Sequence, residues 1–550
     1  MDIIDLLLKQ GIITAEQLNK AKEEVKRTGM KLERALEKLE FINEEDVVKV
    51  KADALGVPYM DLSNYLIDTD LIKLIPENLA KKHKIIPLFK IADILTVAMV
   101  DPMNVEALDQ VRKASSIDIV DPVVVSEKNI NRILDSYYET AGSVDEIVSS
   151  LAKRKFSAAK ESLAEAAVEP PIIRLVNILI MEAVKGRASD IHIEPETDAL
   201  KIRHRIDGIL HEVHVLPKKL QNAVISRVKI LAEMDIAESR RPQDGKLHVR
   251  LEHKELDIRV STFPVIHGEN VVMRLLDKSS VLLGLKDLGF SAEQITLFEK
   301  FIRYPHGIVL VTGPTGSGKT STLYAALVTI SSSEKNIITI EDPVEYELPL
   351  IRQTQVNPKA DITFGNGLRS ILRQDPDIIM VGEIRDKETA EVAVQAALTG
   401  HLVFSTLHTN DAASALTRLT DMGIEPFLIS SSVVAILAQR LVRTVCPKCK
   451  EPCVLSGPVL KEFGAKEEVS GFRGKGCSYC HSTGYAGRVG IFELLVMQDE
   501  IKKLVNEKCS AGEIKKKAVE LGMKTLRFDG LDKIKRGLTT QEEILRVTED

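Results

Sequence analysis

The segment GIVLVTGPTGSGKTSTLYAALVTI, residues 307–330, decides the fold class of this chain. It begins as an apolar run rich in β-branched residues, continues with a match to GxxxxGK[ST] from Gly313 to Thr320, and ends in a helical pattern. Glycines allow main-chain N–H groups to wrap a phosphate where a helix begins. The segment therefore predicts a strand, a phosphate-binding loop and a helix, which is the structural context that this motif requires.

Each residue of the loop has a predicted role. Lys319 would place a positive charge on the β- and γ-phosphates of ATP, and Thr320 would offer a hydroxyl to Mg²⁺. A glycine-rich turn that matches by chance is the alternative, and the strand and helix around the loop weigh against it. The predicted nucleotide-binding residues are Gly313, Pro314, Thr315, Gly316, Ser317, Gly318, Lys319, Thr320 and Ser321.

Acidic residues follow two further apolar runs, NIITI and DIIMV. Glu383 comes after DIIMV, where its carboxylate could polarise the attacking water or reach Mg²⁺. Glu341, Asp342 and Glu345 follow NIITI in the same way. An acid at a strand end is usually a solubilising cap, but these runs alternate with helical stretches and predict a mostly parallel sheet. Ligands bind at the carboxyl edge of such sheets, so we predict a functional role.

Two histidines, His401 and His408, flank the apolar run 402–407. A histidine near a strand end is as often a structural residue as a functional one. The functional alternative is that one of them senses the γ-phosphate and transmits its presence to the sheet.

The composition restricts the class of protein. A length of 550 residues favours about three or four domains. A net charge of -6, with 28% charged residues, argues against a nucleic-acid-binding protein. Apolar residues make up 44% of the chain, yet no apolar run approaches the roughly 20 residues that span a bilayer. We therefore expect a soluble, cytoplasmic protein whose membrane contact runs through partners.

Four of the six cysteines form two CxxC pairs, Cys446 with Cys449 and Cys477 with Cys480. Two such pairs supply four thiolates to a tetrahedral Zn²⁺, and this closed shell leaves no position for a substrate. We therefore predict a structural zinc site. The alternatives are a redox disulfide or unrelated free thiols, with Cys453 and Cys509 left over.

Four motifs, in their order along the chain, resemble the secretion ATPase superfamily of type II secretion and type IV pili. They are GPTGSGKT (313–320), IEDPVEYE (340–347), LRQDPDIIMVGEIRD (372–386) and GHLVFSTLHTNDA (400–412). Three upstream segments resemble the arginine-rich second amino-terminal domain of these enzymes: ASDIHIEP (188–195), RHRIDGIL (203–210) and AESRRPQDGK (237–246). The paired cysteines and the long amino-terminal region are similar to the pilus-assembly and secretion members, since retraction members lack both.

The resemblance covers nearly the whole chain and implies a fold, an activity and partners. The fold is α/β, with a RecA-like P-loop ATPase domain preceded by an α+β (PAS-like) domain and further small amino-terminal domains. The enzyme would be a homohexamer that uses ATP, Mg²⁺ and Zn²⁺. It would drive pilus assembly through an inner-membrane platform protein and cytoplasmic ring components, lying peripherally at the inner membrane. Type II secretion is the alternative, and assembly of a competence pseudopilus is a third variant.

The resemblance also implies roles for individual residues. Each ATP would lie between the two domains of a subunit, and arginines would help to neutralise its phosphates. Glu341 and Glu383 would both be needed for turnover, and His408 lies in the motif that contacts the γ-phosphate region. The candidate arginines are Arg203, Arg205, Arg227, Arg240 and Arg241.

The boundaries that we predict follow the changes in sequence pattern. They are 1–60, a helical docking module; 61–140, an α+β domain; 141–168, a linker or loosely held helix; 169–278, the arginine-rich second amino-terminal domain; 279–498, the ATPase domain with a tetracysteine insert at 446–480; and 499–550, a helical subdomain.

The first 60 residues resemble a module that binds cyclic di-GMP, but they lack its pattern of arginine and glycine at the start and glutamine at the end of each repeat. The positions hold Asp2, Ile4, Lys31, Glu33, Val25 and Ala54 instead. We therefore predict a docking role for this module.

Two functions from other classes remain open. A DNA translocase would show DNA-stimulated turnover and a basic channel, which the net acidic chain disfavours. A scaffold that binds nucleotide without hydrolysis is disfavoured by the presence of Lys319, Thr320 and Glu383.

Overall fold

A computed structural model describes residues 3–9, 11–30, 32–138, 144–153, 167–252, 254–277, 284–455 and 469–548. The chain divides into two compact units, Met1–Ser280 and Val281–Asp550. Most of the predicted linker 141–168 lies outside the described residues, and within it Val144–Lys153 form helix α9. No helix of the described part is both long and apolar enough to cross a membrane.

The first unit opens with short helices that begin and end at capping residues. Thr14 and Asn43 form capping boxes, and the corresponding helices end at Gly29 and Gly56, whose φ angles are positive. Buried apolar residues, among them Leu7 and Leu36, join the helices into one cluster. The helices are α1 Ile3–Lys9, α2 Ala15–Thr28, α3 Leu32–Lys38 and α4 Glu44–Leu55.

An α+β segment with its own apolar core follows. Strand β3 pairs with β2 in antiparallel and with β4 in parallel orientation, and the surrounding helices cover this small sheet. The elements are β1 Tyr65–Leu66, α5 Thr69–Ile72, α6 Glu77–His83, β2 Ile85–Ile91, β3 Ile94–Met99, α7 Val105–Ser115, β4 Ile119–Val124 and α8 Glu127–Tyr138.

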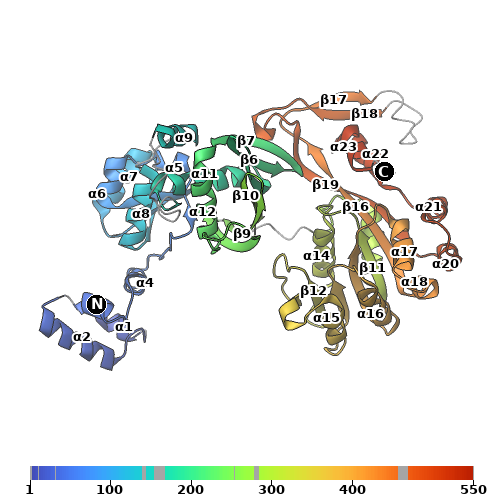
Figure 1. The fold of residues 1–550 in the computed structure, drawn as a ribbon, viewed down its shortest axis with the longest axis horizontal. Coiled ribbons are helices and arrows are strands. Elements are labelled where there is room, and N and C mark those ends of the chain that lie inside the picture. The colour runs from blue at the N-terminus through green and yellow to red at the C-terminus, as the bar shows by residue number, and fades with distance from the viewer. Residues whose placement is uncertain are drawn as a thin grey trace. The chain divides into compact units, whose positions relative to one another are not determined.

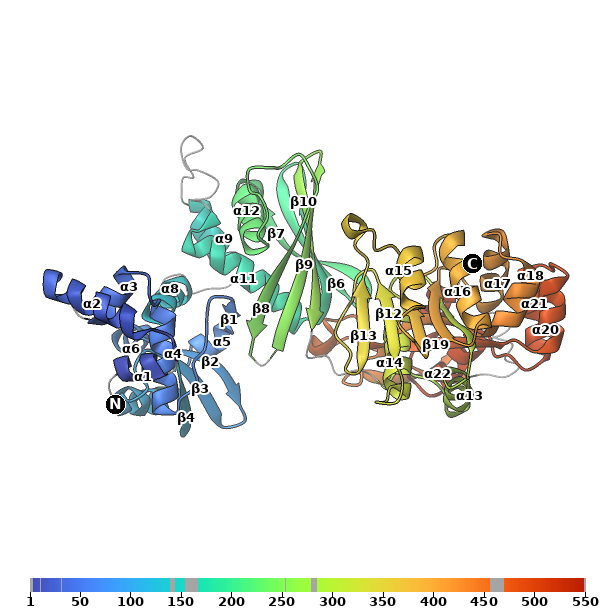
Figure 2. The same cartoon turned by 90° about the horizontal axis from the view of Figure 1, so that it is seen from below.

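The arginine-rich segment forms a larger sheet, ordered β1-β8-β9-β10-β5-β6-β7 within the described residues. Its strands alternate buried and exposed residues, as a sheet with one covered face requires. Helices α11 and α12 cover the buried face (Figure 2). The elements are α11 Pro170–Lys185, β5 Ala188–Pro195, β6 Ala199–Ile206, β7 Ile209–Pro217, the 3₁₀ helix η1 Lys218–Leu220, α12 Gln221–Leu231, β8 Gln243–Leu251, β9 Lys254–Val265 and β10 Gly268–Asp277.

The second unit contains the predicted parallel sheet, ordered β13-β12-β14-β15-β11-β16-β19 in the described residues. All neighbouring strands are parallel except β16 and β19. Alternate residues of β11 belong to two different apolar clusters. Ile308 and Leu310 lie in one cluster, and Val309 and Val311 lie in the other. Both faces are therefore covered, which confirms the α/β prediction (Figure 1).

The elements of this sheet and its helices follow the predicted alternation. They are α13 Ala292–Ile302, β11 Gly307–Thr312, α14 Lys319–Ile330, β12 Ile337–Glu341, β13 Ile351–Gln355, η2 Pro358–Ala360, α15 Phe364–Ile371, β14 Ile378–Val381, α16 Lys387–Leu398, β15 Leu402–Leu407, α17 Ala412–Asp421, α18 Pro426–Ser432, β16 Val433–Val445 and β19 Tyr485–Val496.

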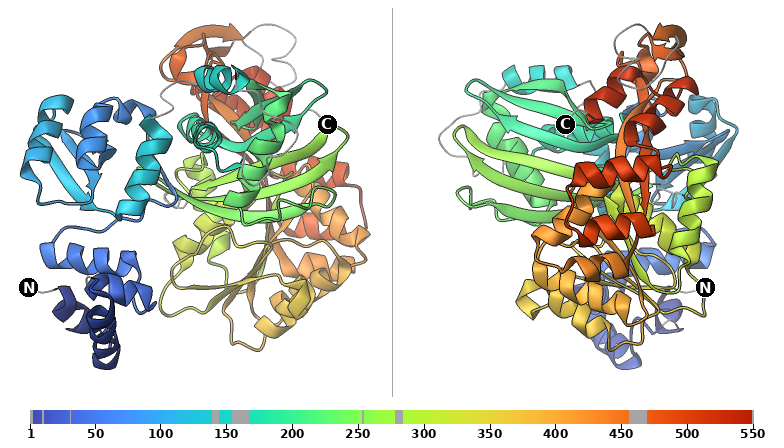
Figure 3. Two further views of the ribbon diagram at one scale, coloured as in Figure 1. Left: turned by 60° about the vertical axis from the view of Figure 1, so that its left-hand side comes forward. Right: turned by 90° about the vertical axis from the view of Figure 1, so that its right-hand side faces the viewer.

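A hairpin and a group of helices complete the second unit. The hairpin consists of β17 Lys450–Leu455 and β18 Val469–Gly474, followed by η3 Ser478–Cys480. The helices are α20 Asp499–Asn506, α21 Ala511–Glu520, α22 Leu526–Lys535 and α23 Gln541–Thr548. Helices α22 and α23 contact the long strands β19 and β16 (Figure 3).

Candidate nucleotide site and metal centre

The predicted phosphate-binding loop joins β11 to α14. Gly316 and Gly318 have φ angles of +80° and +87°, a left-handed conformation that glycine adopts without strain. A Cβ atom on Gly318 would also lie 2.8 Å from Nε2 of Gln439. Lys319 Nζ donates hydrogen bonds to the carbonyl oxygens of Gly313 (2.7 Å) and Pro314 (3.2 Å), so the lysine closes over its own loop.

The loop has the electrostatic properties of an anion site. Burial lowers the pKa of Lys319 to about 8; the negative charge of Glu383 opposes this shift and the positive charge of Arg440 adds to it. Ser317 Oγ is buried and has no hydrogen-bond partner among the described residues. A buried ammonium and an unpaired hydroxyl both carry an energetic cost that a bound phosphate would relieve. These residues therefore fit a nucleotide phosphate.

The predicted acids and His408 follow strands that end at the same edge of the sheet. The parallel registers pair Thr312 with Leu407 and Val381 with Ser405, so the residues that follow β11, β14 and β15 emerge together. Ligand sites of open α/β sheets form at this edge. The fold thus brings the loop, Glu383 and His408 to one place, as the sequence predicts.

Glu383 and His408 are in direct contact. His408 Nε2 lies 3.2 Å from Glu383 Oε2, while the other carboxylate oxygen of Glu383 is paired with Arg385. The side chain of Glu383 is 13% exposed and that of His408 is 48% exposed. Thr406 Oγ1 donates to the carbonyl of Gly382 at 2.8 Å and so holds the backbone before Glu383. The pair is fixed from two strands yet partly open to solvent.

Glu341 has a different environment from Glu383, although both acids lie at the carboxyl ends of apolar strands. Its residue is only 3% exposed, and its carboxylate accepts hydrogen bonds from Thr339 Oγ1 (2.5 Å), Gln353 Nε2 (3.1 Å) and the hydroxyl of Tyr324. Burial, followed by the hydrogen bond to Glu341, raises the pKa of Tyr324. The carboxylate of Glu341 is therefore engaged inside the protein, whereas that of Glu383 lies within electrostatic reach of Lys319.

His401 occupies the opposite end of β15 from His408. Its Nδ1 atom lies 2.9 Å from the carbonyl oxygen of Ala396 and 3.3 Å from Thr399 Oγ1. Of the two histidines that flank this strand, His408 alone contacts a predicted acid among the described residues. The contacts of His401 with Ala396 and Thr399 are those of a structural residue, which is the other role that the sequence allows.

Sequence reasoning missed two residues of β16 that border the loop. Gln439 Oε1 accepts a hydrogen bond from Thr322 Oγ1 at 2.6 Å, which links β16 to the loop helix. Arg440 donates to the main-chain oxygen of Asn410 at 2.8 Å and to its Oδ1 at 3.2 Å, and burial lowers the pKa of Arg440. The only sequence signal was that these two polar residues interrupt an apolar run, VVAILAQRLV.

The five candidate arginines belong to the first unit and differ in their engagement. Arg203 pairs with Glu194 at 2.5 Å, and Arg205 lies 3.6 Å from Asp190. Burial lowers the pKa of Arg227 to about 10, and the charge of Arg132 adds to this shift. The side chains of Arg240 and Arg241 are the most open of the five, 92% and 85% exposed.

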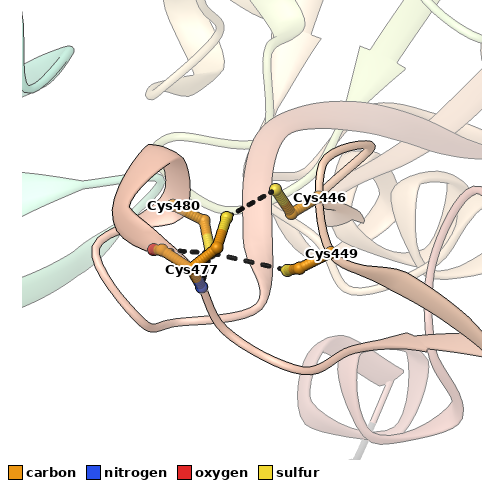
Figure 4. Close-up of side chains that lie close together, drawn as sticks. All are labelled: Cys446, Cys449, Cys477 and Cys480. Carbon is orange, nitrogen blue, oxygen red and sulfur yellow. Dashed lines mark hydrogen bonds between the residues drawn. The ribbon is translucent and has the colours of Figure 1, made fainter.

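The four paired cysteines come together as a compact cluster (Figure 4). Sulfur–sulfur distances are 3.8 Å for Cys446 with Cys477, 3.8 Å for Cys449 with Cys480, and 3.7 Å for Cys477 with Cys480. Four sulfurs in a tetrahedron at about 2.3 Å from a central Zn²⁺ lie about 3.8 Å apart. A disulfide requires about 2.05 Å. The cluster therefore fits Zn²⁺ and does not contain a disulfide.

Backbone donors support the sulfurs as thiolates. The N–H groups of Gly476 and Gly484 donate to the sulfurs of Cys449 and Cys480, each at 3.3 Å. Hydrogen bonds to a metal-bound thiolate stabilise its negative charge. The remaining cysteines, Cys453 and Cys509, are free thiols outside the cluster.

Comparisons with known proteins agree with this geometry. Residues 165–546 match the profile of the family described as type II/IV secretion system protein, and residues 55–144 match that of the MshEN domain. The type IV pilus assembly ATPase PilB of Myxococcus xanthus is 44% identical over 553 residues, which cover 98% of each chain. The type II secretion system ATPase E of Vibrio cholerae is 53% identical over 393 residues, which cover 71% of this chain and 78% of that protein.

A solved structure shares the fold at lower identity. The ATPase DotB of Yersinia pseudotuberculosis aligns with a TM-score of 0.52 and 20% identity, over 72% of this chain and 96% of that chain.

Proposed function

The chain belongs to the type II/IV secretion system protein family, and on this premise we propose that it is an ATPase motor that drives type IV pilus assembly. The assignment as an ATPase depends on one observation. At the carboxyl edge of the sheet, the charge of Glu383, which contacts His408, acts on the loop lysine Lys319. The pilus assignment is supported by the similarity to PilB along 98% of both chains.

Hydrolysis divides into binding by the loop and activation of water by the pair. The loop amides and the ammonium of Lys319 hold and neutralise the phosphates. Glu383 orients the attacking water and accepts its proton, while His408 fixes the carboxylate and stands next to the γ-phosphate. Thr320 and Glu383 are the residues that would hold Mg²⁺, which supplies positive charge to the phosphate oxygens when bound. Glu341 adds a second carboxylate at the carboxyl edge of the sheet, where buried hydrogen bonds hold it in place.

The motor would act as a homohexamer, with arginines of the first unit completing the site. Arg240 and Arg241 have the most exposed guanidinium groups of the five candidates, so they are best able to reach an anion. Each of the other three candidates would have to give up its present position. Arg203 and Arg205 would leave their acidic partners, and Arg227 would leave a partly buried site. The hexamer would push on an inner-membrane platform protein and cytoplasmic ring components from the cytoplasmic side.

The decisive experiment is release of orthophosphate from ATP by the purified full chain with Mg²⁺. We expect Lys319→Ala to lower turnover by at least about a hundredfold, because it removes a charge that stabilises the transition state. Lys502→Ala, on an exposed ion pair with Asp499, serves as the matched control and should keep wild-type turnover. Wild-type turnover in Lys319→Ala would refute this site.

Type II secretion is the second candidate function, because the chain is 53% identical to the type II secretion ATPase of V. cholerae over 393 residues, against 44% over 553 residues for PilB. Deletion of the gene, scored for surface pili and for exported enzymes side by side, separates the two. Loss of pili alone supports the proposal, and loss of export alone supports the alternative. Turnover that rises severalfold with added DNA would instead favour a translocase.

A further inference from the structure

Residues 409–412 connect His408 to helix α17, and every one of them is held by a different element. Thr409 Oγ1 lies 2.7 Å from Thr312 Oγ1, and the N–H of Thr409 donates to the same oxygen at 3.0 Å. Thr312 directly precedes the phosphate-binding loop. Asn410 accepts two hydrogen bonds from the buried Arg440 of β16. The first half of this segment is thus tied to the strands that border the loop.

The second half is tied to the carboxy-terminal helices. Asp411 caps α17 through Oδ1, which accepts from the N–H of Ser414 at 2.8 Å, and Oδ2 pairs with Lys515 of α21 at 2.8 Å. The N–H of Ala412 donates to Glu493 Oε1 at 3.0 Å. Glu493 is 1% exposed, and its other oxygen accepts from the N–H of Leu526, where α22 begins, at 3.4 Å.

From these contacts we propose that Lys515 is a positioning residue for the His408–Glu383 pair, an inference that rests on the proposed ATP site. The partner of Lys515 is Asp411, which lies outside both the loop and the pair. Lys515 acts through Asp411, which lies three residues after His408. The side chain of Asp411 is only 19% exposed. The ion pair therefore couples the helical subdomain to the place where water is activated.

The magnitude of the effect follows from geometry. Reacting groups must be held within about 0.5 Å of their productive position, and a displacement of about 1 Å can lower a rate by about a hundredfold. Without Lys515, the carboxylate of Asp411 keeps its capping hydrogen bond but loses its cation, so the segment after His408 loses its tie to α21 and is held less firmly. Binding of ATP depends on the loop, where Lys319 is held by the carbonyl oxygens of Gly313 and Pro314, so affinity should stay unchanged.

The test compares Lys515→Met with two matched variants of the full chain. Methionine retains most of the apolar stem of lysine and removes the charge. Lys515→Arg restores the charge, and Lys517→Met removes a lysine of similar exposure, which pairs with Glu520, from the same helix. We expect kcat of Lys515→Met to fall about tenfold with KM for ATP within about twofold, because positioning is lost while binding remains. Lys515→Arg should recover most of kcat, and Lys517→Met should match wild type.

A second variant separates positioning from stability. Asp411→Asn keeps the helix cap, since asparagine caps helices as well as aspartate, but it loses the ion pair. Its kcat should fall as in Lys515→Met, and thermal unfolding should remain near that of wild type. In a His408→Ala background, Lys515→Met should cause no additional loss, because the group that it positions is gone.

Wild-type kcat in both Lys515→Met and Asp411→Asn would overturn this inference, and so would a loss that is equally large in the His408→Ala background. If these variants hydrolyse ATP normally while Lys319→Ala is inactive, only the inference fails. If wild-type protein releases no orthophosphate at all, the proposed function fails first.

Discussion

Two acids with the same sequence signature, Glu341 and Glu383, differ in what surrounds them. Each lies at the carboxyl end of an apolar strand, but the carboxylate of Glu341 is enclosed by Tyr324, Thr339 and Gln353. Glu383 instead pairs with Arg385 and His408 and reaches the field of Lys319. A carboxylate that must approach water needs this partly open position, which favours Glu383 as the residue that activates water.

Glu383→Gln should still bind ATP but hydrolyse it about 10²- to 10⁴-fold more slowly, the usual range for loss of a general base. Glutamine keeps the size of the side chain but cannot accept the proton. Binding of a fluorescent ATP analogue and release of orthophosphate measure the two effects separately. A variant that binds nothing would assign Glu383 a structural role.

The depressed pKa of Lys319 predicts a pH dependence of nucleotide affinity. A bound phosphate favours the charged amine and raises its pKa, whereas the free protein has a value of about 8. The affinity is therefore fully present well below pH 8 and declines as pH rises through 8, by up to about tenfold per pH unit. Dissociation constants measured from pH 7 to 9.5 check this, and a slope that persists in Lys319→Ala would assign it to another group.

At the scale of elements, local sequence signals set where helices begin, whereas contacts between distant residues assemble the cysteine cluster. Helix starts at Thr14, Asn43, Ser291 and Ser510 coincide with capping boxes, which act within four residues of the chain. The tetracysteine cluster joins residues 31 positions apart, on both sides of the β17–β18 hairpin. A metal held by the four sulfurs would cross-link the two ends of this hairpin.

Zinc should be present at one ion per chain, and Cys477→Ser should lose it. The variant should also unfold at a lower temperature, by about 2–4 °C for each kcal/mol of stability lost. Metal analysis and thermal unfolding measure both quantities. Cys453→Ser is the matched control, because Cys453 lies on β17 outside the cluster. Full zinc content in Cys477→Ser would contradict a four-thiolate site.

At the scale of the whole molecule, the nucleotide loop and the candidate arginines belong to different compact units. The proposed motor assigns neutralisation of the phosphate charge to the exposed arginines of the first unit.

The double variant Arg240→Ala/Arg241→Ala should bind ATP normally but turn it over about a thousandfold more slowly, as expected for loss of an arginine that neutralises transition-state charge. Arg112→Ala, which removes an exposed arginine paired with Asp109 in the same unit, is the control and should retain activity. Steady-state turnover and nucleotide binding distinguish the outcomes. Wild-type turnover in the double variant would leave Arg203, Arg205 and Arg227 as the remaining candidates.

The sequence by itself determined the phosphate loop, the parallel sheet, the cysteine cluster and the family, because each depends on residues at short spacing or on an apolar period. It also pointed to Glu383 and His408, since parallel strands bring their carboxyl ends to one edge. Only the tertiary structure distinguished Glu383 from Glu341, placed Gln439 and Arg440 beside the loop, and joined Lys515 to Asp411. The contacts of Gln439, Arg440 and Lys515 link residues 30 to 117 positions apart. The difference between the two acids depends on burial, which no local pattern encodes.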